Sequence, residues 1–598
     1  MRIRTMRKLH PVAIAVAIAA CTSAFANADS CQRPYVEINK LQGATAESPV
    51  VGQTVETRGL VLATLYADSK TPQLLLQSLQ PDLNDQTAEA ILVTDSVLAQ
   101  KTAPGTILHL RGTVREINGM TALTNTDNSF AATCGKTTAP EPVPVKLPRQ
   151  TNDSWERLEG MWLSFPQPLI VNDTYTLARF GEVLVADKRL RVATEIEQPG
   201  KTASQFEAAQ QLSELMLDDG SQIQNPDPVP FVADGLAANR TLRVGDTLRG
   251  VQGFLLQTKQ GYRLLVSQMP THDATNPRPS APPAKTQQEL RIASFNVLNF
   301  FTGEGKNPFP TKRGASSADE LTRQQAKMVA ALAAMDADVI GLLEVQNNGF
   351  EKGGALQTLV KALNQQVGSD MYQAVLPKEK PGTDDIMVAM IYRSAAVKPV
   401  GQAAVKLDGP FSKGSRPPLA QSFVHTTSGQ TVTVGINHFK SKGSCPKEPS
   451  ADSDQQDGQG CWNGARVAAA TALNQWLVTN PTGVSTDYQV IMGDFNAYRK
   501  EQPIQTLEQA GWQHLANATE VHSSFVFKGR SGTLDHALAS KALHAKLQRF
   551  AHWSINADEP EVLDYNMEHK TPEQQQTWYA PTPYRSSDHD PLYMDFKF

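Results

Sequence analysis

The most constraining feature of this sequence is the alternation of strand-like and helix-like segments between residues 288 and 598. Apolar runs of strand length occur at 291–299, 338–344, 386–392, 431–437 and 488–492, and amphipathic runs of helical length at 321–335 and 465–477. Strands that alternate with helices form layered α/β domains, because the helices cover the faces of the sheets. We therefore expect an α/β domain at 288–598, in which Gln324, Gln325 and Lys327 lie on the solvated side of their helix.

Most strand-like runs of this domain end in a polar residue that an apolar strand does not require. Taken one at a time, these residues have ordinary interpretations, such as a turn, a solvated strand end or a hydrogen-bonded core histidine. Because strand ends meet at a common edge of a sheet, we expect them to gather into one site. The set comprises Asn296, Glu344, His438, Asp494, Asn496, Asp535, His536, Asp588, His589 and Asp590.

The segment before this domain is rich in short β-type runs separated by turns. Five such runs between residues 35 and 138 predict a small OB-fold-like barrel at 29–140. OB folds commonly bind single strands or sugars, but these runs show no series of aromatic residues for stacking. A binding module and a structural spacer are therefore both open interpretations.

A second β-rich region covers residues 145–270 and predicts another OB-like domain, with a short helix at 205–217. Residues 271–287 are rich in proline and lack apolar periodicity, which predicts an exposed, semi-rigid linker.

Residues 1–28 have the pattern of an export signal, with a basic start, an apolar run at 12–20 and a small-x-small cleavage site at Ala24–Ala26. We therefore expect a secreted or periplasmic protein. An alternative is cleavage before Cys21, which would leave a lipoprotein anchored to the membrane. No later run reaches the roughly 18 apolar residues that a membrane span requires.

The remaining cysteines are Cys31, Cys134, Cys445 and Cys461, an even number that suits an oxidising compartment. Three pairings are conceivable, and proximity in the sequence favours disulfides Cys31–Cys134 and Cys445–Cys461. A metal site is disfavoured because no CxxC motif or paired histidines accompany them.

The charge balance limits how a polyanion could be bound. With 40% hydrophobic and 19% charged residues, the composition excludes a disordered or fibrous chain. The formal net charge is −4, so bulk charge would not attract a nucleic acid. Local arginines or a bound metal ion would have to neutralise its phosphates.

Six motifs of the α/β domain together resemble the endonuclease/exonuclease/phosphatase superfamily, which includes DNase I and abasic-site endonucleases. Flanking segments are similar to ExeM/NucH-type bacterial extracellular nucleases, which also carry OB-type domains upstream. The resemblance implies a four-layered DNase I-like sandwich with a metal-dependent phosphodiesterase site. In chain order, the motifs are Ser294-Phe-Asn296, Gly341-Leu-Leu-Glu344, Asn437-His438-Phe-Lys440, Gly493-Asp494-Phe-Asn496, Thr533-Leu-Asp535-His536 and Ser587-Asp588-His589-Asp590.

The resemblance also implies a metal site and a set of catalytic residues. Hydrolysis of an anionic phosphodiester needs a cation at the phosphate, a base for water and an acid for the leaving oxygen. Glu344, with Asn296 and Asp588, is expected to hold Mg²⁺, which Ca²⁺ or Mn²⁺ could assist or replace.

The remaining motif residues are expected to act on water and phosphate. Asp494 would orient or deprotonate water, and Asn496 would donate a hydrogen bond to a phosphate oxygen. Asp535 would hold His589 against the phosphate, with His438 on the opposite side. Which histidine acts as the acid stays open.

Three further residues are candidates for substrate binding. Arg416 resembles the superfamily arginine that contacts a backbone phosphate, and its alternative is a surface arginine before a turn. Asp384 stands where relatives place a polar active-site residue, and it is equally consistent with an ordinary turn. Lys440 and Lys442 would add positive charge beside His438 or would solvate their loop.

The combined prediction is a secreted, monomeric, metal-dependent endonuclease that cleaves extracellular DNA, with RNA as a further candidate substrate. A phosphatase or phosphodiesterase of the same superfamily that acts on another phosphoester is the alternative. It is disfavoured because neither a Trp-Cys-Asp-Arg motif nor an aromatic membrane hairpin is evident. A third possibility is a nucleic-acid-binding protein without enzymatic activity, which the complete set of expected acids, bases and ligands argues against.

Overall fold

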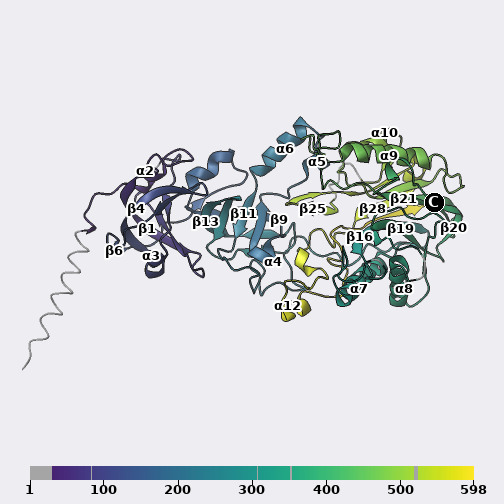
Figure 1. Ribbon diagram of the computed structural model, residues 1–598, viewed down its shortest axis with the longest axis horizontal. Helices are drawn as coiled ribbons and strands as arrows, with labels where there is room; N and C mark the ends of the chain where they lie inside the picture. The colour runs from purple at the N-terminus through teal and green to yellow at the C-terminus, as the bar shows by residue number, and fades with distance from the viewer. Residues whose placement is uncertain (1–29, 83, 306, 351–352, 517–522) are drawn as a thin grey trace, which may run out of the picture.

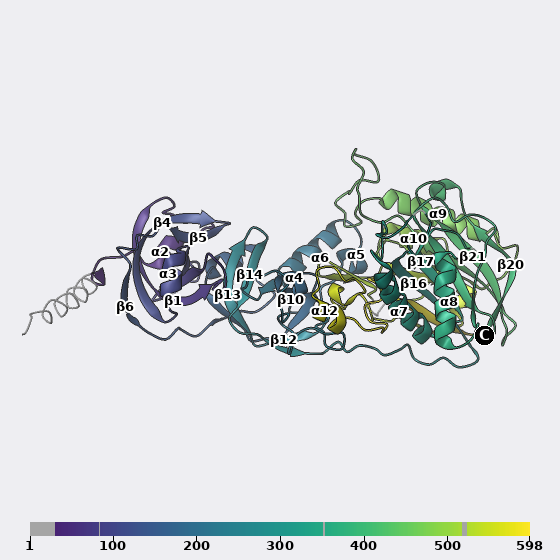
Figure 2. The same cartoon turned by 60° about the horizontal axis from the view of Figure 1, so that its bottom comes forward.

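The computed structural model describes residues 30–82, 84–305, 307–350, 353–516 and 523–598. The predicted export signal and Cys21 lie outside these residues. A barrel, a middle domain and a C-terminal domain follow one another along the long axis of the molecule (Figures 1 and 2). Within the described ranges, no helix combines the length and the apolar character that crossing a membrane would take.

The barrel contains a closed ring of five strands. The ring runs β1-β2-β3-β5-β4 and closes because β4 also pairs with β1, while β6 extends the sheet beyond β4. Helix α2 (Ile38–Gln42) and helix α3 (Ser96–Lys101) accompany it. The strands confirm the five predicted runs; their bounds are β1 Thr54–Leu65, β2 Gln73–Gln77, β3 Ala90–Val93, β4 Thr106–Ile117, β5 Met120–Thr124 and β6 Ala132–Lys136.

The middle domain is built on a nine-stranded sheet with the order β15-β12-β9-β10-β11-β14-β13-β8-β7. The region is β-rich as predicted, and in the described residues the two end strands of this sheet do not pair with each other. The strands are β7 Val143–Pro144, β8 Trp162–Phe165, β9 Leu169–Asp173, β10 Glu182–Ala186, β11 Leu215–Asp218, β12 Thr247–Arg249, β13 Val251–Thr258, β14 Gly261–Val266 and β15 Thr271–Asp273.

The helix predicted at 205–217 is only partly correct. Helix α6 covers Lys201–Gln211, and the segment after it forms strand β11. Leu215 and Leu217 are buried in β11, which pairs with β10 on one side and β14 on the other. Two neighbouring strands therefore decided the conformation of a short apolar run that is compatible with either structure. The short helices α4 (Leu177–Phe180) and α5 (Ala193–Ile196) complete the domain.

The C-terminal domain is a sandwich of two six-stranded sheets, with orders β18-β19-β17-β16-β29-β28 and β20-β21-β22-β23-β27-β24. An apolar core lies between the sheets, a second lies under helices α7 and α8, and a third lies under helices α9 and α10. This arrangement confirms the predicted four layers. The helices are α7 Ala318–Met335, α8 Ala355–Val367, α9 Asn463–Leu477 and α10 Gln502–Gln509. The strands of the first sheet are β16 Glu289–Phe300, β17 Val339–Gln346, β18 Tyr372–Ala374, β19 Ile386–Arg393, β28 Leu547–His552 and β29 Leu592–Lys597; those of the second are β20 Val397–Val405, β21 Arg416–His425, β22 Thr431–His438, β23 Gln489–Asp494, β24 Gln513–His514 and β27 Asp535–Ala539.

Helix α7 differs from its prediction on its polar side. Gln324 and Lys327 are buried rather than solvated. The amide of Gln324 donates to the carbonyl of Leu298 at 2.9 Å, and Lys327 Nζ donates to the carbonyl of Tyr584 at 2.8 Å. Burial lowers the pKa of Lys327 to about 7. The polar face of this helix is therefore covered by distant loops, which its own periodicity cannot reveal.

The proline-rich segment is also less free than predicted, because it is fastened to the C-terminal domain. Arg278 forms an ion pair with Glu559 at 2.6 Å, and the carbonyl of Pro279 accepts a hydrogen bond from Trp553. Lys285 pairs with the buried Asp338. These contacts hold the segment along the domain surface.

Candidate functional site

Four of the predicted polar residues form a row across the second sheet of the C-terminal domain. Arg416 on β21 is the register partner of His438 on β22, which pairs with Asp494 on β23, which pairs with Asp535 on β27. Neighbouring strands lie about 4.8 Å apart. The row therefore spans roughly 15 Å of one sheet edge.

His589, from the loop before β29, pairs with Asp535 at the end of this row. His589 Nδ1 lies 2.7 Å from Asp535 Oδ2, and both side chains are buried. Burial alone would lower the pKa of His589, but the charges of Asp535 and Asp588, the hydrogen bond to Asp535 and the charge of Asp494 raise it well above its usual value. The geometry therefore favours an imidazolium at His589.

The short hairpin of β25 (Phe525–Phe527) and β26 (Arg530–Gly532), with Ser524 just before it, supports this pair. Ser524 Oγ donates to Asp535 Oδ2 at 2.7 Å and accepts from the backbone amide of Asp535 at 3.2 Å. The ring of Phe525 lies 4.7 Å from the His589 ring. We did not predict either residue, because their importance depends on contact with Asp535 and His589 and no motif marks it.

His438 and Asp494 form a second, looser pair. His438 Nε2 lies 3.3 Å from Asp494 Oδ2, and the backbone amide of Asn496 donates to Asp494 Oδ1 at 2.7 Å. Burial raises the pKa of Asp494, but the hydrogen bond and charge of His438 and the charge of His589 bring it down to about 2. Asp494 is therefore an anion at neutral pH.

The turn after β23 depends on one glycine and one asparagine. A Cβ atom at Gly493 would lie 2.0 Å from the carbonyl oxygen of Asn437, so the neighbouring strand leaves no room for a side chain. Asn496 has a φ of +47°, a left-handed conformation that asparagine tolerates. Its amide donates to the carbonyl of Phe439 at 3.1 Å.

The three predicted metal ligands come from the first sheet and from the loop before β29. Asn296 Nδ2 donates to Glu344 Oε1 at 3.2 Å, and the backbone amide of Asn299 donates to Glu344 Oε2 at 3.1 Å. Ser587, next to Asp588, donates to the backbone carbonyl of Asn296 at 2.7 Å. Glu344 has a φ of +62°, a strained conformation that these contacts maintain.

The donor atoms suit a hard divalent cation. Glu344 and Asp588 are half-buried carboxylates, and in the described part of the chain neither forms an ion pair with a lysine or arginine. The described residues hold no group of three or more His, Cys, Asp or Glu side chains that could bind an ion on its own. Mg²⁺ is commonly held by one or two carboxylates, waters and substrate phosphate, so the residues fit such an ion. Asn296, whose amide nitrogen faces Glu344, would orient that carboxylate.

A cluster of basic residues lies at the Arg416 end of the row. Arg416 is buried, donates to the carbonyl of Phe439 and lies 3.6 Å from Asp384. Arg313 lies 4.0 Å from the same carboxylate. Burial, and to a smaller extent the charge of Arg416, lower the pKa of Lys440, while the charge of Asp384 raises it. Asp384 thus lies between the guanidinium groups of Arg416 and Arg313 and orients them.

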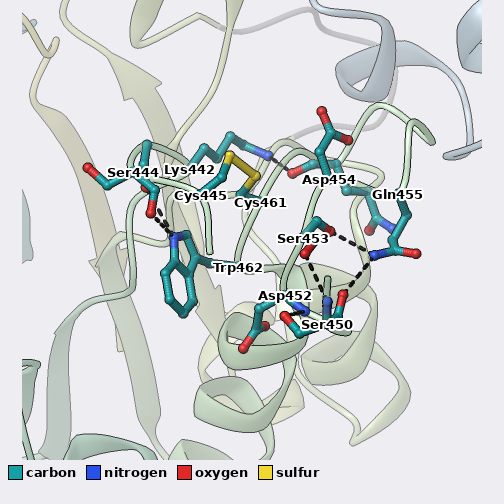
Figure 3. Close-up of a disulfide and its surroundings, with 12 residues drawn as sticks. Lys442, Ser444, Cys445, Ser450, Asp452, Ser453, Asp454, Gln455, Cys461 and Trp462 are labelled. Atoms are coloured by element: carbon teal, nitrogen blue, oxygen red, sulfur yellow. Dashed lines mark hydrogen bonds between the residues drawn. A yellow bond between two sulfur atoms is a disulfide. The ribbon is translucent and has the colours of Figure 1, made fainter. Parts of the chain in front are cut away.

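Both predicted disulfides, Cys31–Cys134 and Cys445–Cys461, are formed. The second closes a loop in which Trp462 directly follows Cys461 (Figure 3). Trp462 donates to the carbonyl of Ser444 at 3.0 Å, and Lys440 Nζ lies 5.0 Å from the centre of the Trp462 ring. The loop therefore supports Lys440 through Trp462. Lys442 instead forms an ion pair with the buried Glu501 at 2.6 Å, which gives it a structural role.

Two residues of the polar set lie in structural positions. His536 Nε2 faces the carbonyl of Ala497 at 2.8 Å, and its Nδ1 faces His514 at 3.0 Å. Burial lowers the pKa of His536 to about 4, so it stays neutral. Asp590 Oδ1 accepts backbone hydrogen bonds from Ile555 and Asn556 and fixes the loop beside His589.

A cavity of about 670 Å³ opens next to the predicted metal ligands, and we call it the interdomain cleft. Asn299 and Asp588 line it from the C-terminal domain, and Asp173 and Tyr175 line it from the middle domain. The hairpin residues Phe525 to Lys528 form another wall. The candidate site is therefore bordered by two domains.

Comparison with protein families gives matches in two regions. Residues 293–589 match the Endonuclease/Exonuclease/phosphatase family, and residues 141–274 match a family described as Domain of unknown function (DUF8508). No curated protein matches the chain. The C-terminal half therefore carries an endonuclease/exonuclease/phosphatase domain, a type that typically hydrolyses phosphoesters and generally uses divalent metals.

Several solved structures are similar to the C-terminal half. An endonuclease/exonuclease/phosphatase family protein from Bacteroides thetaiotaomicron is 15% identical, with 51% of this chain and 97% of that chain covered and a TM-score of 0.33. The human Nocturnin catalytic domain with bound sulfate is 18% identical, with 53% and 96% covered and a TM-score of 0.32. D. rerio TDP2 complexed with a single-strand DNA product is 15% identical, with 52% and 99% covered and a TM-score of 0.33.

Proposed function

We propose that this protein is a metal-dependent endonuclease that acts as a monomer outside the cytoplasm and hydrolyses phosphodiester bonds of DNA, with RNA as a further candidate. The observation that carries the proposal is that a protonated His589 lies beside an ionised Asp494 of the second sheet, while its neighbours Ser587 and Asp588 lie beside Asn296 and Glu344 of the first sheet. An anionic diester needs this combination of positive charge, base and metal ligands. The two disulfides support an oxidising, extracellular location.

Glu344 and Asp588 would hold Mg²⁺, which when bound supplies a Lewis acid that offsets charge on the phosphate. The remaining steps belong to side chains of the chain itself. Asp494 accepts a proton from the attacking water or orients it, and its pKa of about 2 keeps it ready as an anion. His589, held by Asp535, donates a hydrogen bond to a phosphate oxygen as negative charge builds.

His438 and the basic cluster would act on the other side of the phosphate. Within the described residues, His438 Nδ1 is buried without a hydrogen-bond partner, and His438 Nε2 lies 3.3 Å from Asp494 Oδ2, which places the imidazole beside the proposed base. Asn496 keeps one N–H bond for a phosphate oxygen after donating the other to Phe439. Arg416, Arg313 and Lys440 would draw the adjoining backbone phosphates toward this edge.

We also infer that the barrel is an OB-type module that holds the polymer. Its five strands close into a ring, as in OB barrels. Arg33 and Arg111 both lie over the ring of Phe130, at 4.8 and 3.5 Å from its centre. Such a mixed aromatic and cationic surface suits single-stranded nucleic acid. A sequence resemblance to ExeM/NucH-type nucleases is consistent with this arrangement.

The first test of the function uses the purified full chain and His589→Ala. The protein should nick supercoiled plasmid with Mg²⁺ and stop when a chelator removes the metal. His589→Ala should lower turnover by at least about a hundredfold, the scale of losing one hydrogen-bond donor to the developing charge. Gel densitometry of the nicked and linear products measures both effects.

His544→Ala is the matched control, because His544 lies on α11 (Lys541–His544), beyond the end of β27 that is opposite Asp535. It should cut at the wild-type rate. Undiminished cutting in chelator would refute the metal role, and wild-type turnover in His589→Ala would refute the assigned site. Release of phosphate from small phosphomonoesters without plasmid cutting would favour the phosphatase alternative.

A further inference from the structure

The interdomain cleft carries exposed aromatic side chains from two different domains. Tyr175, in the loop after β9, is 70% exposed, and Phe527, at the end of β25, is 56% exposed. Both line the cleft. Large aromatic side chains are usually buried or half-buried, so two that face one cavity beside a reaction site indicate a binding surface.

The hairpin connects this surface directly to the reaction centre. Phe525 and Phe527 are two residues apart on strand β25, so their side chains share one face about 7 Å apart. Phe525 touches the ring of His589. A group that stacks on Phe527 would therefore lie next to a phosphate held at His589, within the length of about one nucleotide.

The charges that line the cleft exclude a run of phosphates. Besides the proposed metal ligand Asp588, three carboxylates line the cleft, those of Asp173, Glu561 and Asp564, against two basic side chains, Lys528 and Arg585. Like charges disfavour a phosphate among these carboxylates. The amino groups of nucleobases, in contrast, donate hydrogen bonds to carboxylates, as cytosine N4 does to Asp or Glu.

The two sides of the reaction centre thus differ in chemistry. Arg416, Arg313 and Lys440 gather at one side, where they favour backbone phosphates. The cleft on the other side offers aromatic faces and acceptor oxygens. A polynucleotide that crosses the site would place phosphate on the basic side and a base in the cleft.

We propose that the interdomain cleft is a binding site for one unpaired nucleobase, stacked on Phe527 and on Tyr175 of the middle domain. The inference rests on the proposed nuclease function and names the substrate form: a nucleotide whose base is not paired, in a single strand or flipped from a duplex. Because every base has an aromatic face, this site tolerates all four bases. The middle domain then completes the substrate site of the C-terminal domain.

Binding of a fluorescently labelled single-stranded oligodeoxynucleotide, measured by anisotropy in the presence of chelator, tests the proposal without relying on catalysis. Phe527→Ala and Tyr175→Ala should each weaken binding by about tenfold, the scale of one base–aromatic stack. Tyr175→Phe, which keeps the ring, should bind like the wild type. Oligonucleotides in which single bases are replaced by abasic sites should bind the wild type about tenfold more weakly at one position only.

At that position, the alanine variants should show no further loss, because the stacking partner is already missing. Leu376→Ala is the matched control, since Leu376 is 60% exposed on the same domain as Phe527 and lines none of the cleft. Equal affinity of Phe527→Ala, Tyr175→Ala and wild type, or no sensitive abasic position, would overturn the base site. If binding depends on Phe527, Tyr175 and one base position but the wild-type protein does not cut plasmid, the proposed nuclease function is refuted and the base site stands.

Discussion

The middle domain contacts its two neighbours through interfaces that differ in how many ion pairs they contain. Toward the barrel it presents an apolar patch in which Leu256 and Leu265 pack against Leu60, Leu75 and Met120. Toward the C-terminal domain it presents ion pairs and hydrogen bonds, among them Arg243 with Glu559 and Arg189 with Asp558. Leu563 and Trp578 of the C-terminal domain also join the middle domain's apolar core, so the second interface adds a polar network to apolar packing.

This difference has a functional consequence, because only the polar interface reaches the candidate site. Arg189 Nε donates to Ser531 Oγ at 2.9 Å, and the backbone of Ser531 exchanges hydrogen bonds with Leu190 and Val192 of the middle domain. Ser531 lies in the hairpin that carries Phe525. Directional hydrogen bonds can fix the position of this hairpin, whereas apolar contacts mainly add free energy without setting a direction.

The largest expected effect concerns Glu559, which is fully buried and pairs with both Arg243 and Arg278. Glu559→Ala should lower the free energy of unfolding by about 3–5 kcal/mol, because it leaves these guanidinium groups without a counter-charge. Urea denaturation followed by circular dichroism measures the loss. Asp273→Ala is the control: its partner Arg249 is 54% exposed, so about 0–1 kcal/mol is expected. Equal losses in the two variants would mean that the ionic interface contributes little.

A second prediction uses one buried glutamate at each interface. Burial raises the pKa of Glu195, which accepts amide hydrogen bonds from Thr533 and Arg499, to about 7. Burial raises the pKa of Glu159, which accepts from Thr121 of the barrel, to about 9. Since each folded pKa lies above the unfolded value of 4.5, ionisation disfavours the folded state, and the free energy of unfolding falls as pH rises from the unfolded pKa to the folded pKa.

Replacing each glutamate by glutamine removes this titration and keeps an acceptor oxygen. Relative to wild type, Glu195→Gln should gain about 2–3 kcal/mol of stability between roughly pH 5 and pH 7 and then level off. Glu159→Gln should keep gaining stability relative to wild type until the pH reaches about 9. Urea denaturation across the pH range measures both curves. Parallel curves for the two variants would show that the interfaces do not differ in this respect.

The smallest expected effect is on turnover and rests on the proposed function. Arg189→Ala should lower the rate of plasmid nicking by about tenfold, because the hairpin beside His589 loses a directional support. Leu265→Ala should destabilise the apolar interface by about 2–4 kcal/mol and leave the nicking rate of folded protein within about twofold. Rates are measured well below the unfolding midpoint of each variant. A larger loss of turnover in Leu265→Ala than in Arg189→Ala would reverse the comparison.

Local pattern was sufficient for much of the C-terminal domain. The runs at 386–392 and 431–437 form β19 and β22, and the amphipathic run at 465–477 lies within α9. These elements follow from apolar periodicity, which is a local property. The two disulfides also agree with prediction, because four cysteines of this spacing left few pairings.

Predictions failed where a distant segment covers a residue or supplies its partner. Lys327 has the position of a solvated residue on its helix, yet it is buried and donates a hydrogen bond to the backbone carbonyl of Tyr584. The run at 215–217 became strand β11 because two strands of the middle domain flank it. Ser524 could not be recognised from the sequence, since its hydrogen bond to Asp535 depends on the position of the hairpin.

By itself, the sequence determined which segments are strands and helices in most of the C-terminal domain, and which acids, amides and imidazoles stand at the strand ends. Covalent order and side-chain periodicity are sufficient for that, because both are read along the chain. Only the tertiary structure decided which of these residues are buried, how His589 and Asp494 are charged, and that the middle domain borders the site. Burial, charge and docking depend on what surrounds a residue in space, and those neighbours come from segments tens to hundreds of positions away.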